Sequence, residues 1–249
     1  MNVYLIIEYD GTDYCGWQIQ PNGASVQEEL QRALFKLTGE KISVTGSGRT
    51  DSGVHAAGQT ASFSVEKENI PPENYAPALN GLLPKDIRVL KSGRAPDGFN
   101  ARFSAKRKTY RYTFYVSAVE RPLYERYAVR TLPLDTEKMR AAAAALVGEK
   151  DFKCFCAANS SVKDTVRTLY SLEVERRGDF ITVTACGNGF LYNMVRIVAG
   201  TLAAAGEGKL SVEDVKKIVE GGKRAEGKTM PAKGLCLLSV EYGGALHNI

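Results

Sequence analysis

Histidine is nearly absent from this 249-residue chain, which has only His55 and His247. This scarcity excludes zinc hydrolases of the His-Glu-x-x-His type, and a Ser-His-Asp triad would have to use His55. The five cysteines include no Cys-x-x-Cys pair and indicate reduced thiols rather than a metal site. We therefore expect chemistry that runs mainly on carboxylate, phenol and guanidinium groups.

Long apolar runs are also lacking. The longest, such as 141–147, fall far short of the roughly 20 residues that span a bilayer. The N-terminal apolar stretch meets Glu8 too soon to be a signal peptide. The sequence therefore predicts a cytoplasmic protein with no membrane association.

Charge is present in ordinary amount but is unevenly distributed. Hydrophobic residues make up 44% of the chain and charged residues 24%, which is typical of a globular protein. Residues 1–103 carry 10 basic and 12 acidic side chains, whereas residues 104–249 carry 23 and 16. A basic half indicates a polyanionic partner, most often nucleic acid, although a solvated basic surface explains the charge equally well.

The order of the expected secondary structure repeats once along the chain. Strands are expected at 3–9, 42–45, 59–65, 87–90, 110–116, 167–176, 180–186 and 235–242. Helices are expected after Ser25, near 72–82, after Asp135, near 191–205 and at 212–220. Each half reads roughly β-α-β-β-α-β. We therefore predict an α+β protein of two tandem split-βαβ (ferredoxin-like) units with mainly antiparallel sheet, divided into domains 1–103 and 104–249.

Residues 222–229 match the Walker A pattern of nucleotide-binding loops letter for letter. A working loop of this type follows a buried strand and opens a helix. Here a helix-like stretch precedes the match, and Pro231 prevents a helix after it. We interpret the segment as a basic loop, and an ATP-dependent enzyme that uses Lys228 remains an alternative.

A glycine-rich segment at 46–55 carries Arg49 and Asp51 between two expected strands. Its three glycines within eight residues let the backbone turn tightly and admit a ligand. A carboxylate in a partly buried loop needs a nearby cation to remain ionised, and Arg49 and Arg196 are the two candidates. A plain connecting turn with a local ion pair is the alternative.

Two further candidate site residues, Arg196 and Tyr110, lie in the basic half of the chain. Arg196 interrupts the apolar stretch 189–200; a buried arginine there requires an anion, whereas an extended one reaches solvent. Tyr110 lies in 107–115, where aromatic and basic residues alternate. Its ring either stacks on a nucleobase or belongs to the core. A non-catalytic RNA-binding module would use the same features.

Several segments together resemble a tRNA pseudouridine synthase of the TruA family. The most specific is 48–56, which matches the family's signature, and 9–18 resembles its opening motif. Asn100 and Lys150 stand where histidine is more usual in the family. The remaining similar segments follow in the family's order at 83–87, 101–105, the Tyr110 strand, 194–196 and 231–235.

The resemblance implies the pseudouridine synthase fold, with an active-site cleft between the halves, a homodimer, and no cofactor or metal. It implies isomerisation of uridine to pseudouridine at positions 38, 39 and 40 in the anticodon stem and loop of tRNA. By the same resemblance Asp51 is the catalytic aspartate, Tyr110 lies against the uracil, and Arg196 pairs with Asp51. Arg49 holds the tRNA or the flipped nucleotide. Asp51 either attacks C1′ or removes the 2′ proton, and the sequence leaves both open.

Overall fold

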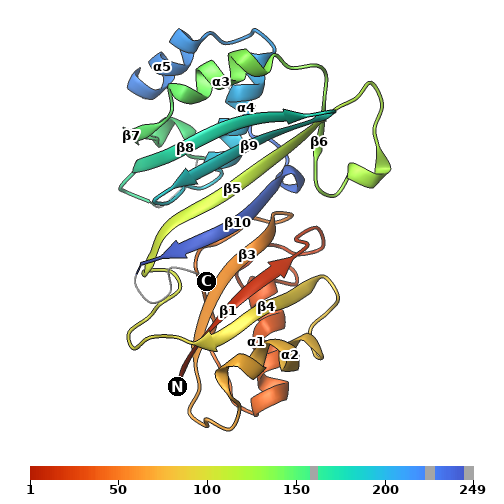
Figure 1. Ribbon diagram of the computed structural model, residues 1–249, viewed down its shortest axis with the longest axis vertical. Helices are drawn as coiled ribbons and strands as arrows, with labels where there is room; N and C mark the ends of the chain where they lie inside the picture. Colours follow the sequence, from red (N-terminus) through yellow and green to blue (C-terminus); the bar gives the residue numbers. More distant parts are fainter. Residues whose placement is uncertain (158–161, 222–227, 244–249) are drawn as a thin grey trace. The chain divides into compact units, whose positions relative to one another are not determined.

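The computed structural model describes residues 1–157, 162–221 and 228–243 (Figure 1). The chain divides into two compact units, of which the first comprises Met1–Lys106 and the chain from Leu237 onward, and the second Arg107–Cys236. These units differ from the ranges 1–103 and 104–249 chiefly at the C-terminal strand. The Walker A match falls largely outside the described residues. None of the described helices is long and apolar enough to cross a membrane.

The first unit is built on a sheet in the order β4-β1-β3-β10 (Figure 1). β1 lies between β3 and β4 and is antiparallel to both. A two-residue strand, β2, pairs antiparallel with β3 as well. The strands are β1 (Asn2–Tyr9), β2 (Thr45–Gly46), β3 (His55–Ser64), β4 (Ile87–Arg94) and β10 (Leu235–Tyr242), the last from Leu237 onward.

Helices α1 (Val26–Thr38) and α2 (Tyr75–Asn80) belong to the first unit, with a 3-10 turn, η1 (Pro72–Asn74), before α2 (Figure 1). The predicted start of α1 is confirmed, because the Ser25 hydroxyl accepts a hydrogen bond from the Glu28 amide. Leu30 and Leu34 are fully buried, so this face of α1 contributes to the core.

The strand predicted at 42–45 is wrong, since only Thr45 of that range belongs to a strand. Val44 instead bonds to two side chains of α1. Its amide donates to Gln31 Oε1 at 3.1 Å, and its carbonyl accepts from Gln27 Nε2 at 2.8 Å. Helix side chains therefore satisfy the backbone groups that a neighbouring strand would otherwise pair.

The second unit has the strand order β5-β9-β8-β7, and each neighbouring pair in that order is antiparallel. β6 pairs parallel with β5. The predicted β8–β9 hairpin is confirmed, and Gly178 takes a φ of 60° at its turn. The strands are β5 (Ala105–Val116, in this unit from Arg107), β6 (Val129–Thr131), β7 (Gly148–Asp151), β8 (Val166–Arg177) and β9 (Phe180–Gly187).

Helix α3 (Thr136–Ala144) packs on β8 and on helices α4 (Met194–Gly206) and α5 (Val212–Gly221) (Figure 1). The Asp135 carboxylate caps α3 by accepting from two backbone amides, as the sequence predicts. Short 3-10 turns are η2 (Pro122–Tyr124), η3 (Lys153–Phe155) and η4 (Ala232–Gly234). The predicted α+β class with mainly antiparallel sheet is confirmed.

Candidate functional site

Asp51 lies in the loop that connects β2 to β3. A tight turn orders the loop, because the Val54 amide donates to the Asp51 carbonyl at 3.1 Å and Gly53 takes a φ of 76°. Asp51 is half-buried and Arg49 is exposed. The structure therefore places both predicted residues of the first unit on one ordered loop.

The segment 9–18 runs against this loop and bonds to its backbone on both sides of Asp51. On the N-terminal side, the Trp17 amide donates to the Thr50 carbonyl at 3.1 Å. On the C-terminal side, the Gly53 amide donates to the Tyr14 carbonyl at 3.3 Å. Backbone bonds thus hold the loop on both sides of Asp51 and fix the position of its main chain.

Two glycines permit this close approach. A Cβ atom on Gly16 would lie 2.5 Å from the Thr50 carbonyl oxygen, and one on Gly11 would lie 2.0 Å from that of Val54. Gly16 also has a φ of 109°, which other residues rarely adopt. A buried hydrogen bond of 2.8 Å joins the hydroxyls of Tyr9 and Thr50. The two segments that resemble the family's motifs therefore form one structural element.

Tyr110 lies on β5 in the second unit, opposite Ala185 of β9. Its side chain is buried, and only 8% of its surface is exposed. The ring of Phe190 packs against it edge to face, with centroids 5.2 Å apart and an interplanar angle of 83°. This contact fixes the orientation of the Tyr110 ring.

Arg196 lies in the first turn of α4 and is half-buried. Its Nε atom donates to the Met230 carbonyl and its Nη1 atom to Asn193 Oδ1, both at 2.7 Å. Sequence analysis left open a buried arginine beside an anion and an extended arginine in solvent. The structure shows that two neutral oxygens accept hydrogen bonds from the guanidinium, and pairing with Asp51 stays a prediction.

The segment from Lys228 to Pro231 lies closely on α4 and β5. A Cβ atom on Gly200 would lie 1.9 Å from the Lys228 carbonyl oxygen, so only glycine permits this contact. The Tyr112 hydroxyl donates to the Pro231 carbonyl at 2.7 Å. Burial raises the pKa of Tyr112 well above its usual value, and the charge of Arg196 opposes part of that rise. Tyr112 is therefore a neutral hydrogen-bond donor that fixes this segment.

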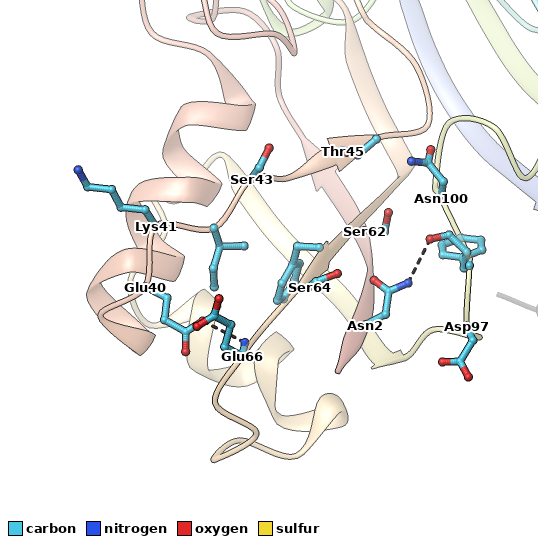
Figure 2. Close-up of a pocket in the computed structure, with 14 residues that line it drawn as sticks. Asn2, Glu40, Lys41, Ser43, Thr45, Ser62, Ser64, Glu66, Asp97 and Asn100 are labelled. Carbon is cyan, nitrogen blue, oxygen red and sulfur yellow. Dashed lines mark hydrogen bonds between the residues drawn. The ribbon is translucent and has the colours of Figure 1, made fainter.

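A separate cavity of about 760 Å³ opens in the first unit (Figure 2). Asn2 bridges one side by donating to the Phe99 carbonyl at 3.1 Å. Its charged lining residues are Lys41 and three carboxylates, Glu40, Glu66 and Asp97. Excess negative charge disfavours RNA phosphates, and none of the four predicted site residues lines the cavity. We therefore do not place the site there.

Sequence analysis did not identify the supporting roles of Tyr9, Trp17 and Met230. Tyr9 and Trp17 belong to the segment 9–18, so the resemblance itself was the available signal. Met230 directly precedes the similar segment 231–235. Its contribution is a backbone carbonyl, for which no side-chain pattern gives a signal.

Comparison with known proteins covers almost the whole chain. A family described as tRNA pseudouridine synthase matches residues 5–104 and 142–243, which include Asp51 and Arg196 but not Tyr110. "tRNA pseudouridine synthase A" of Citrifermentans bemidjiense is 49% identical over 245 residues, covering 97% of each chain. The protein of the same name from Thermoanaerobacter sp. is 44% identical over 243 residues, covering 97% of this chain and 99% of the other.

A solved structure titled "Crystal Structure of a Cbf5-Nop10-Gar1 Complex" aligns with a TM-score of 0.39 and 11% identity. The alignment covers 99% of this chain and 59% of that one, and the likeness is too remote to bear on the fold or the site. The family match and the curated relatives extend over both units, and they include the Asp51 loop and the start of α4. The chain belongs to the tRNA pseudouridine synthase family.

Proposed function

We propose that this chain converts uridine to pseudouridine at positions 38, 39 and 40 in the anticodon stem and loop of tRNA, as the resemblance implies. Family membership over nearly the whole length supports the activity. The observation that carries the assignment of the site is the Asp51 loop, whose backbone bonds to the segment 9–18 on both sides of the carboxylate. A reaction at a ribose carbon requires a carboxylate at a defined position, and an ordered loop supports this.

The reaction breaks the bond between uracil N1 and ribose C1′, turns the base, and joins C5 to C1′. The proton leaves C5 and one is gained at N1, so the product is an isomer of the substrate. A base within a stem or loop must first be extruded, at a cost of about a few kcal/mol. Phosphate contacts from the basic residues of 104–249 offset that cost.

Asp51 acts on the extruded nucleoside in its ionised form. It either attacks C1′ covalently or removes the 2′ proton to give a glycal, and both routes need a carboxylate. Arg196 supplies the positive charge that keeps this carboxylate ionised when water is excluded. Tyr110 provides a ring for the uracil, and its hydroxyl is the candidate base for the C5 proton. Arg49, exposed on the Asp51 loop, holds the tRNA backbone or the flipped nucleotide.

The partners follow from the same family assignment. We propose that the protein works on tRNA in the cytoplasm as a homodimer, without a cofactor or metal. The high Lys and Arg content of 104–249 is suited to the phosphate backbone. Sedimentation of the purified chain measures the oligomeric state, and a monomer at working concentrations would remove the dimer from this proposal.

Asp51→Asn tests the function directly. The substitution keeps the size of the side chain but removes the charge and replaces one acceptor oxygen by an NH2 donor, so turnover is abolished and tRNA binding stays nearly unchanged. Tritium release from tRNA labelled at uridine C5 measures turnover, and filter binding measures affinity. Asp97→Asn, at an exposed position in the same unit, is the matched control and retains wild-type turnover.

Three outcomes contradict the proposal. Appreciable turnover by Asp51→Asn removes Asp51 from the mechanism. Saturable tRNA binding by the wild-type chain with no isomerised uridine indicates a non-catalytic RNA-binding module. Tight ATP binding that is lost in Lys228→Ala indicates the nucleotide-binding alternative.

A further inference from the structure

Asn193 has an unusual backbone conformation directly before α4. Its φ of 59° and ψ of 8° place it in the left-handed region, and it is the only non-glycine residue with positive φ in the described chain. Asparagine tolerates this region better than most residues because its short polar side chain can bond locally. The backbone conformation alone therefore favours glycine or asparagine at this position.

The side chain of Asn193 does not perform the usual task of an asparagine at a helix start. Such a residue normally accepts a hydrogen bond from the second or third amide of the helix. Asn193 makes no side-chain capping bond, and its Oδ1 accepts instead from Arg196 Nη1 at 2.7 Å. Its oxygen is directed to the guanidinium and away from the helix amides.

The Met230 carbonyl holds the other side of the same guanidinium, at 2.7 Å from Nε. A guanidinium is planar, so two acceptors on different nitrogens define both its position and the direction of its plane. The left-handed backbone of Asn193 puts its carboxamide within reach of Nη1 of Arg196, which lies about one helical turn further along the chain.

We propose that Asn193 is a positioning residue for the isomerisation, acting by orienting the Arg196 guanidinium. The inference rests on the proposed catalytic role of Arg196. Asn193 contributes to the rate of the chemical step through Arg196, and it contributes little to tRNA affinity. Asparagine is suited to the position because it combines a tolerated left-handed backbone with a short neutral acceptor.

Asn193→Gly separates the side chain from the backbone. Glycine adopts the same φ without strain, so the variant removes the Oδ1 acceptor and keeps the turn into α4. We expect the single-turnover rate of tritium release to fall about tenfold to a hundredfold, with tRNA Kd unchanged. Gly208→Asn is the matched control, because Gly208 has a φ of 76° just after the other end of α4. It exchanges the same two residue types in the opposite direction at a similarly positive φ, and its rate stays at the wild-type value.

A double-mutant cycle with Arg196→Lys tests whether Asn193 acts through Arg196. Lysine keeps the charge but has one nitrogen, so it cannot use the two acceptors as the guanidinium does. In the Arg196→Lys background, Asn193→Gly should lower the rate by less than about twofold. A merely structural role at the helix start would give the same loss in both backgrounds.

Two results overturn the inference while the proposed function stands: a wild-type rate for Asn193→Gly, or equal losses in the two backgrounds. A wild-type rate for Arg196→Lys contradicts an orientation-dependent role of the guanidinium, and the inference fails with it. Asp51→Asn, measured beside these variants, reports on the proposed function independently.

Discussion

Gly16→Ala tests whether the contact between the segment 9–18 and the Asp51 loop sets the activity. The new Cβ atom would lie 2.5 Å from the Thr50 carbonyl oxygen, whereas ordinary contact begins near 3.4 Å. The loop or the segment must therefore move by roughly 0.9 Å. Thr50 directly precedes Asp51, so this displacement reaches the carboxylate.

The expected losses of stability and of kcat in Gly16→Ala follow from backbone strain at residue 16, collision with the Thr50 carbonyl and a lost hydrogen bond. Alanine at the φ of 109°, which lies beyond the left-handed helical region, costs about 1–3 kcal/mol. Loss of the bond from the Trp17 amide to the Thr50 carbonyl costs about 1 kcal/mol more. For a chain of this size, each kcal/mol lowers Tm by about 2–4 °C. A displacement of about 1 Å at the carboxylate proposed to react lowers kcat by about a hundredfold.

Gly39→Ala is the control variant, because it introduces backbone strain without a collision. Gly39 ends α1 with a φ of 74°, and nothing lies within 4 Å of its Cβ position. It should lower Tm by the strain alone and leave the rate of tritium release at the wild-type value. Calorimetry and single-turnover assays on both variants make the comparison. If the two variants lose equal Tm and both keep the full rate, the Asp51 loop does not depend on the segment 9–18 as argued.

Three other outcomes are expected. Tyr110→Phe keeps the ring and removes the hydroxyl, so tRNA Kd should be unchanged while the single-turnover rate falls by about a hundredfold or more; an unchanged rate would limit Tyr110 to stacking. Gly200→Ala pushes away the Lys228 carbonyl and with it the nearby Met230 carbonyl, which accepts from Arg196, so both Tm and kcat should fall. Wild-type values of both Tm and kcat would refute this connection between Gly200 and Arg196. Burial raises the pKa of the Cys154 thiol from 9.0 to about 11. Its stabilising contribution is complete below pH 9 and is lost as pH rises through 11, so urea unfolding should show a larger loss of stability between pH 8 and 11 for the wild type than for Cys154→Ala; equal losses would contradict this.

Helix caps and a hairpin turn could be predicted from the sequence, because each depends on residues close together in the chain. The caps at Ser25 and Asp135 and the turn at Gly178 each need only residues within a few positions, and the structure shows all three. The strand expected at 42–45 failed because its backbone is satisfied by Gln27 and Gln31, whose side chains reach it from α1. The β-branched pattern of that range carries no information about this competition.

The hydrogen bonds that support the site could not be predicted, because they too join residues far apart in the sequence. Tyr9 and Thr50 are 41 residues apart, and Arg196 and Met230 are 34 apart. No helical or strand period links positions at such separations, and the Met230 acceptor is a carbonyl that every residue type carries. The resemblance identifies the proposed site residues, whereas the contacts that orient them join residues far apart in the sequence.

The place of β10 in the first unit has a consequence for protein synthesis. β3 is complete at Ser64, but its neighbour in the sheet from Leu237 onward leaves the ribosome about 170 residues later. At about 5–20 residues per second, that interval is roughly 10–35 s. A nascent first unit therefore keeps one side of β3 largely unpaired while the second unit is translated, and exposed strand edges invite association with other chains. Emergence of β10, more than emergence of residues 1–106, is the event that lets the sheet of the first unit form completely.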